Sequence, residues 1–181
     1  RLVRLAFIHQ QFEAIHPFLD GNGRIGRLLI SLLLVEWGLL PLPLLYLSAY
    51  FERERQTYYD LLWRVNADGD WRSWTLFFLH GVAEQARDAS ARAKRLQDLQ
   101  AEWRAHIIHA RAPALTLVLI DELFRSPMVT IPHVAKLLGV TYHSAQRHVE
   151  RLLHAGILTQ VSDQSAGKLF SAREILEITT S

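Results

Sequence analysis

The sequence contains no cysteine, and its charges are almost balanced. Without thiols the chain can form neither disulfides nor thiolate metal sites, and this favours a protein of the cytoplasm. The 20 lysines and arginines against 18 aspartates and glutamates leave a net charge of +2. So small an excess gives no indication of a nucleic-acid partner, because binding to nucleic acid depends on positive charges that neutralise phosphates.

Long apolar runs are also missing. The most hydrophobic stretch, residues 28–47, contains Glu36 and is interrupted by Gly38, Pro41 and Pro43. Its uninterrupted runs are much shorter than the ~20 residues that a membrane-spanning helix needs. We therefore expect no membrane partner, and we expect a buried helix followed by a loop. Half of the 181 residues are hydrophobic, which is enough to bury one sizeable core or two smaller ones.

Hydrophobic residues recur at helical spacing through most of the first 110 residues. This spacing predicts four helices and then a long polar helix or helix pair, over residues 2–15, 24–37, 50–65, 71–85 and 86–110. The second helix is apolar on nearly every face, which is typical of a central helix surrounded by others. Because the first helical pattern is already under way at Arg1, we expect further sequence before it.

The pattern changes near residue 114. Three shorter helices and two short strands are predicted there, over residues 115–124, 130–139, 141–156, 157–161 and 168–171. Thr130 and Thr141 are typical N-caps, and residues 163–167 predict a turn between the strands. The expected organisation is a helical domain, a helical linker and a small α+β domain, at 1–85, 86–112 and 113–181.

Between the first two predicted helices lies the stretch His16-Pro17-Phe18-Leu19-Asp20-Gly21-Asn22-Gly23-Arg24-Ile25-Gly26-Arg27. Glycines tolerate positive φ, so this turn can direct backbone N–H groups toward an anion, and the following helix adds the positive end of its dipole. Arg24 and Arg27 are three residues apart, so they share a helix face and can bind one polyphosphate. A polar connection with an incidental histidine is the alternative, but such a connection needs no convergence of these groups.

This stretch resembles the signature of the Fic (Fido) family, His-x-Phe-x-(Asp/Glu)-Gly-Asn-Gly-Arg-x-x-Arg. All eight fixed positions are matched, by His16, Phe18, Asp20, Gly21, Asn22, Gly23, Arg24 and Arg27. The likeness continues as far as Trp71, over roughly the first half of the chain. Members of the family are mostly protein adenylyltransferases, which move AMP from ATP onto a protein hydroxyl. The related Doc-type toxins transfer phosphate and lack the glycine pair and the second arginine, so Arg27 favours transfer of AMP.

The resemblance implies a fold and a set of roles. Residues 113–181 resemble a winged helix-turn-helix domain, so the expected fold is an all-α Fic helical domain followed by a small winged-helix (α+β) domain. By resemblance, His16 would be the general base for a Ser, Thr or Tyr hydroxyl of a target protein. Asp20 would hold Mg²⁺, which prefers carboxylate and phosphate oxygens. The Asn22 side chain and the N–H groups around Gly21 and Gly23 would form an anion hole for the α- and β-phosphates of ATP.

Further positions are implied to bind the nucleotide. Arg24 and Arg27 would bind its β- and γ-phosphates. Phe18 belongs to the same binding stretch and is expected mainly to anchor the loop in the core. The positions that line the adenine and ribose side in the family are occupied here by Tyr59, Leu62 and Asn66. Alternatively, Tyr59 and Leu62 are core residues of their helix.

Two elements of the family are not found in this sequence. Fic enzymes align the target peptide with a β-hairpin flap, and many are restrained by an inhibitory helix whose glutamate engages the second arginine of the motif, here Arg27. We expect the inhibitory helix upstream of Arg1, where it would restrain activity, and a start of the sequence inside a longer protein would account for the missing flap as well.

Two other interpretations stay open. His9, Glu13 and His16 share one helical face and have the spacing of a metal site, although that site would remove His16 from catalysis. The third helix of the second domain displays residues suited to phosphates and base edges, namely His143, Ser144, Gln146, Arg147 and Arg151. The alternative function is therefore a DNA-binding or protein-interaction regulator whose Fic domain is only regulatory. Six basic and six acidic residues leave residues 113–181 without net charge, which favours protein contact or a homodimer equally well.

Overall fold

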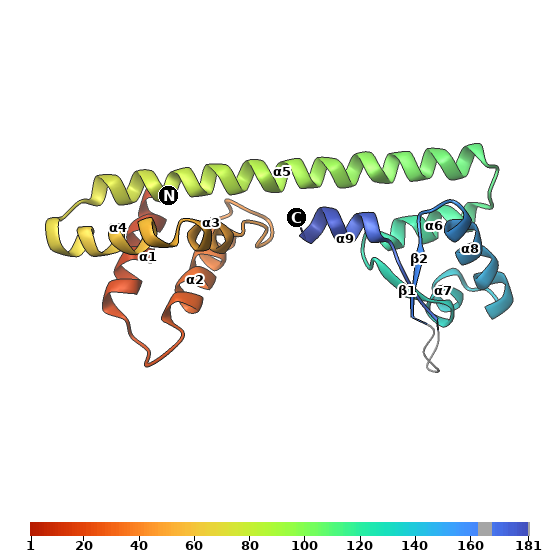
Figure 1. Ribbon diagram of the computed structural model, residues 1–181, viewed down its shortest axis with the longest axis horizontal. Helices are drawn as coiled ribbons and strands as arrows, with labels where there is room; N and C mark the ends of the chain where they lie inside the picture. The colour runs from red at the N-terminus through yellow and green to blue at the C-terminus, as the bar shows by residue number, and fades with distance from the viewer. Residues whose placement is uncertain (163–167, 181) are drawn as a thin grey trace. The chain divides into compact units, whose positions relative to one another are not determined.

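The chain forms two compact units, Arg1–Ser90 and Ala91–Ser181 (Figure 1). The computed structural model describes residues 1–162 and 168–180, so the predicted turn at 163–167 lies outside the described residues. The boundary between the units falls inside one helix, α5 (Trp71–His109). Helix α5 is continuous over the residues where the sequence predicts a helix at 71–85 and a separate polar segment after it.

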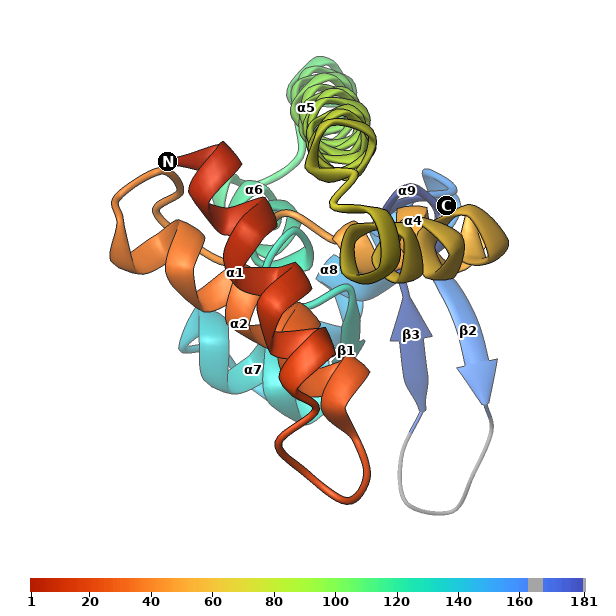
Figure 2. The same ribbon diagram turned by 90° about the vertical axis from the view of Figure 1, so that its left-hand side faces the viewer.

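The first unit is built from helices. They are α1 (Leu2–Ile15), α2 (Asn22–Glu36), α3 (Leu47–Arg53), α4 (Arg55–Asp68) and the first part of α5. Helices α1 and α2 lie side by side and are joined by the loop 16–21 (Figure 2). They approach closely at Gly26, where a Cβ atom would lie 2.3 Å from Oε1 of Glu13 and 3.2 Å from Cε1 of His9. Only glycine leaves room for this contact.

An aromatic core holds these helices together. Trp74 and Phe78 of α5 are fully buried, and the ring of Phe51 stacks on that of Tyr58 with centroids 4.8 Å apart. The indole N–H of Trp74 donates a hydrogen bond of 2.8 Å to the carbonyl of Ala6. This bond ties α1 to α5 and thereby fixes the helix that leads into the motif.

Two sequence predictions for this unit are wrong. The helix predicted over 50–65 is two helices, α3 and α4, because the backbone leaves the helical region at Glu54 (φ −98°, ψ 31°). No proline or glycine marks this break, so the periodicity did not indicate it. Helix α2 was expected to be surrounded by other helices, but Leu28 and Leu32 are 67% and 60% exposed, and the helix buries only the face that carries Ile30 and Leu34. Within residues 1–162 and 168–180, no helix combines the length and the apolar character needed to cross a membrane.

The second unit combines helices with a small antiparallel sheet. Its elements after α5 are α6 (Ala114–Leu123), β1 (Met128–Thr130), α7 (Ile131–Leu138), α8 (Tyr142–His154), β2 (Thr159–Ser162), β3 (Leu169–Ser171) and α9 (Arg173–Thr180). The strand order is β1-β3-β2, with Val129 opposite Phe170. Strand β1 and helix α9 were not predicted. Both predicted N-caps are confirmed, since the Thr130 and Thr141 side chains accept hydrogen bonds from the first turns of α7 and α8.

The core of this unit begins inside the segment expected to be a linker. Leu99, Trp103 and Ile107 of α5 are buried, together with Leu119 and Leu123 of α6. The second half of α5 is therefore part of the second unit's hydrophobic core.

Candidate active site

His16 ends helix α1 in a left-handed conformation, with φ 50° and ψ 59°. Its N–H donates a hydrogen bond of 3.1 Å to the carbonyl of Phe12, and its side chain is exposed. A left-handed backbone costs a residue other than glycine about 1–2 kcal/mol. Such strained positions cluster at functional sites, because a specific side chain is needed there. The strain therefore points to the imidazole as a functional group.

Asn22 begins helix α2 and fixes the shape of the loop. Its side chain is 2% exposed; Oδ1 accepts a hydrogen bond of 2.9 Å from the N–H of Phe18, and Nδ2 donates one of 2.6 Å to the carbonyl of Phe18. The side-chain amide that was expected in an anion hole is thus bonded to the loop itself. The backbone N–H groups in the first turn of α2, after Gly21 at φ 83°, have no partner within the helix and can face an anion.

Both arginines of the motif fold back over this first turn. A Cβ atom on Gly23 would lie 3.1 Å from Nη1 of Arg27, and one on Gly21 would lie 3.4 Å from Nη2 of Arg24. The two glycines therefore leave room for the guanidinium groups beside the free N–H groups. Asp20 lies at the same turn, 3.6 Å from Arg24 between Oδ2 and Nη2, and its side chain is 95% exposed. The loop thus gathers two cations, one carboxylate and a helix N-terminus.

The ring of Phe18 is 48% exposed and lies against Phe12 rather than deep in the core. Its backbone, held by Asn22, anchors the loop instead.

A cavity of about 180 Å³ opens next to the motif. It is lined by Arg27 of α2 and by residues of the α3–α4 region, among them Tyr46, Ser48, Arg55 and Tyr59. Of the three positions expected on the adenine side, Tyr59 lines this cavity with a ring that is 54% exposed. Tyr46, Ser48 and Arg55 also line the cavity and were not predicted from the sequence, because their approach to Arg27 depends on contacts between separate helices.

The other two expected positions do not line this cavity. Leu62 is half-buried against the core of the unit. The side-chain oxygen of Asn66 accepts a hydrogen bond of 3.0 Å from Nε2 of Gln10, which is itself fully buried.

A buried polar cluster lies directly behind the motif. His9 is 1% exposed, and its Nε2 atom is 3.0 Å from the hydroxyl of Tyr58 and 4.0 Å from Oε1 of Glu13. Burial lowers the pKa of His9 to about 4, and the positive charge of Arg27 acts in the same direction. Burial also raises the pKa of Glu13, against the charge of Arg27. His9 is therefore neutral at pH 7 and serves as a packed hydrogen-bonding group.

This cluster does not form the metal site considered from the sequence. The charge of His16 reaches Glu13 and opposes the rise in the pKa of that carboxyl, but the His16 side chain is exposed whereas His9 is buried. In the described part of the chain, no three His, Cys, Asp or Glu side chains gather to hold a metal ion. A lone carboxylate such as Asp20 still suits Mg²⁺ that is held mainly by the phosphates of a nucleotide and by water.

Residues 1–34 match the Fic/DOC family. A probable protein adenylyltransferase from Aquifex aeolicus is 52% identical over 50 residues, which are 25% of this chain and 16% of that protein. The protein adenylyltransferase Fic of Drosophila persimilis is 38% identical over 72 residues, 40% of this chain and 13% of that protein. A Fido domain-containing protein from Dictyostelium discoideum is 48% identical over 40 residues, 22% of this chain and 28% of that protein.

These comparisons confirm the expected likeness to the Fic family for the segment that carries α1, the loop and most of α2. The chain spans between 13% and 28% of the length of these three relatives.

Proposed function

We propose that the first unit is the catalytic core of a cytoplasmic protein adenylyltransferase, a nucleotidyltransferase that moves AMP from ATP onto a Ser, Thr or Tyr hydroxyl of a target protein. One observation carries the proposal: a strained histidine adjoins a helix N-terminus over which two guanidinium groups fold. Two relatives named as protein adenylyltransferases, 52% and 38% identical over 50 and 72 residues, support it, as does the match of residues 1–34 to the Fic/DOC family.

In the proposed reaction, the imidazole of His16 takes the proton of the target hydroxyl while the hydroxyl oxygen attacks the α-phosphorus of ATP. A bond forms between these two atoms, and the bond from the α-phosphorus to the oxygen that bridges to the β-phosphate breaks. The bridging oxygen keeps the electron pair and leaves as part of pyrophosphate. Histidine suits this role because an imidazole nitrogen can accept the proton of a hydroxyl, and the side chain of His16 is exposed.

The first turn of α2 would hold the triphosphate. Its free backbone N–H groups face the α- and β-phosphates, while Arg24 and Arg27 neutralise the charge that builds up on pyrophosphate. Asp20 would hold Mg²⁺, which supplies positive charge to the phosphates when it is bound. The salt bridge of Asp20 with Arg24 joins two exposed side chains and is weak enough to give way.

The adenosine would lie along helix α4, beside Tyr59. Leu62 and Asn66 lie three and seven residues further along the same helix face, outside the cavity, and would contact the adenosine only at its far end. Tyr59 offers an exposed ring on which a base can stack.

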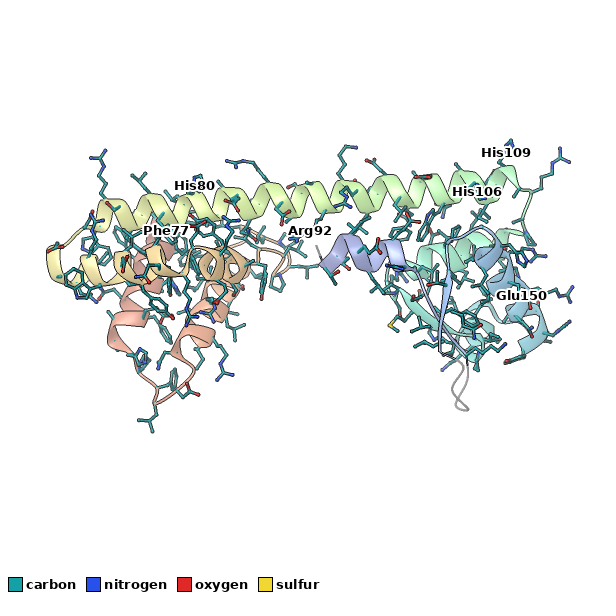
Figure 3. All side chains as sticks on the ribbon, in the orientation of Figure 1. Phe77, His80, Arg92, His106, His109 and Glu150 are labelled. Carbon is teal, nitrogen blue, oxygen red and sulfur yellow. The ribbon has the colours of Figure 1, made fainter. Side chains whose placement is uncertain are left out.

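The test is transfer of label from ATP labelled at the α-phosphate onto proteins of a cell extract. We expect the His16→Ala variant to transfer at least about 10²-fold less label, because it lacks the general base. His80→Ala is the matched control, since His80 is an exposed histidine of the same unit and lies on α5 (Figure 3). Equal labelling by the wild type and the His16→Ala variant, with ATP and Mg²⁺ present, would overturn the proposal.

A second variant excludes misfolding as the cause of lost activity. Glycine adopts the backbone conformation of residue 16 without strain, so His16→Gly should fold at least as stably as the wild type. We expect it to be as inactive as His16→Ala.

We further propose that residues 113–181 form a winged helix-turn-helix domain. Helices α6, α7 and α8, followed by the β2–β3 pair, support this proposal. Tyr142, His143 and Arg147 are exposed near the start of α8, which favours DNA contact as a second candidate function. Gel shifts at several salt concentrations test it: specific binding should be lost in Arg147→Ala, and a failure to shift DNA at low salt would contradict it.

A further inference from the structure

A second cavity, of about 560 Å³, lies within the second unit where α5 and α8 end. Its size is typical of pockets that bind small molecules, which measure ~300–1,000 Å³. Its basic lining residues are His106, Arg111, Arg151 and His154, and its apolar wall includes Ile107 and Pro113. Figure 3 shows His106 near the C-terminal end of α5. None of the described residues that line the cavity is acidic.

The two arginines at this cavity have no carboxylate partner within residues 1–162 and 168–180. The neighbouring carboxylate on α8, that of Glu150, accepts a hydrogen bond of 2.8 Å from Gln146. The Nδ1 atom of His154 lies 2.7 Å from the carbonyl oxygen of Glu150 and donates to it, which leaves Nε2 for another partner. Positive charge therefore gathers at this cavity without an internal counter-charge.

Arg111 is held in a strained conformation. The N–H of Ala112 donates to the carbonyl of Ile107 at 3.2 Å, and the N–H of Arg111 donates to that of Ile108 at 2.9 Å. These two bonds form the helix-ending motif whose left-handed residue is usually glycine. That residue here is Arg111, at φ 52°.

Among the described residues, the other positive-φ positions are glycines and His16 of the candidate active site. The chain thus keeps a residue other than glycine in a strained backbone conformation at two places, and both lie at a cluster of positive charge.

Helix stability alone explains only part of this cluster. Basic residues in the last turns of α5 and α8 complement the negative ends of the helix dipoles, and His106, Arg151 and His154 fit that explanation. Arg111 lies beyond the end of α5, where glycine would stabilise the helix end better. Helix capping therefore does not explain why an arginine stands at position 111, and binding of a ligand by its guanidinium would explain it.

We propose that this cavity binds a small anionic molecule that carries a phosphate or carboxylate group on an apolar body. The guanidinium groups of Arg111 and Arg151 match the two oxygens of such a group. The apolar wall formed by Ile107, Ala112 and Ala155 suits the rest of the molecule and has no use in binding a nucleic-acid backbone. This inference does not depend on the proposed transferase activity.

The test is a titration of the whole chain followed by NMR of the backbone amides at 106–112 and 151–155. Inorganic phosphate, AMP and benzoate are the probes, so that phosphate and carboxylate ligands are distinguished. We expect saturable shifts at these amides for AMP or benzoate, with a Kd below about 1 mM. The proposal is overturned if none of the three probes binds with a Kd below about 1 mM. It is also overturned if duplex DNA shifts these amides more strongly than any probe.

The decisive variant is Arg111→Gly, which should not unfold the protein. Because glycine removes the strain, we expect its melting midpoint to rise by a few degrees. The Kd of the binding probe should increase at least about tenfold, because one charged hydrogen-bond donor is lost. Arg125→Gly removes the same charge from an exposed arginine of this unit that lies outside the cavity. An unchanged Kd in Arg111→Gly, or an equal loss in Arg125→Gly, would show that no specific site exists.

Discussion

Replacing Gly26 with alanine tests how the motif is held against helix α1. The added Cβ atom would lie 2.3 Å from Oε1 of Glu13, 3.1 Å from Cδ1 of Phe12 and 3.2 Å from Cε1 of His9. The Glu13 carboxylate can rotate away, because Oε1 has no hydrogen-bond partner. The His9 ring cannot move easily, since it is buried and bonded to Tyr58. The substitution must therefore push α2 away from α1.

Two opposing terms set the magnitude. Alanine stabilises a helix interior by about 1 kcal/mol relative to glycine. Overpacking a close contact costs about 1–3 kcal/mol. We expect the packing cost to prevail at Gly26, with a net loss of up to about 2 kcal/mol and a melting midpoint lower by up to about 16 °C for a unit of this size.

Thermal unfolding monitored by tryptophan fluorescence measures this change, because Trp74 is buried in the core of the same unit. In a Glu13→Ala background the cost of Gly26→Ala should fall by about 1 kcal/mol, since the nearest clash is gone. At a temperature where the variant is folded, label transfer should drop about tenfold or more, because His16 and the first turn of α2 no longer meet correctly. A Gly26→Ala variant that gains stability would refute the close packing described here.

Three further predictions concern the same unit. Asn22→Ala removes both hydrogen bonds to the Phe18 backbone and should lower the free energy of unfolding by about 1–3 kcal/mol, as measured in urea. His9 has a pKa of about 4 in the folded chain and ~6.5 when unfolded, so its contribution to stability is full above pH ~6.5. As the pH falls from 6.5 to 4, we expect a loss of about 3 kcal/mol, which His9→Gln should abolish. Glu13, whose pKa burial raises, contributes in the opposite sense, with stability that is lost as the pH rises. Tyr59→Ala should raise the KM for ATP about tenfold and change kcat little; an unchanged KM would remove Tyr59 from the nucleotide site.

Local sequence signals predicted the parts of this fold that depend on near neighbours. The turn between α1 and α2 and the caps at Thr130 and Thr141 each involve residues a few positions apart. Elements that depend on contacts between distant segments could not be predicted from the local sequence. Strand β1 is three residues long and forms because Val129 pairs with Phe170, which lies far along the chain.

In the candidate site, too, local features could be predicted from the sequence, whereas contacts between separate segments could not. The types of residue in the motif favour a chemistry that stays a prediction, and they did not indicate which groups bond to the loop itself. The amide of Asn22 bonds to Phe18, because its side chain points back to the loop from the first turn of α2. The close contact at Gly26 could not be predicted either, since it depends on α1 packing against α2. The left-handed backbone of Arg111 could not be predicted, because the type of a single residue does not determine its φ.

The two hydrogen bonds between Asn22 and Phe18 also bear on how a nucleotide associates with this chain. Fixing a loop residue costs about 1–2 kcal/mol of conformational entropy, and here that loss is incurred during folding. A triphosphate that meets the first turn of α2 finds its N–H groups already directed outward. If the proposed nucleotide binds here, we expect its association to show no slow loop-closing phase at the motif.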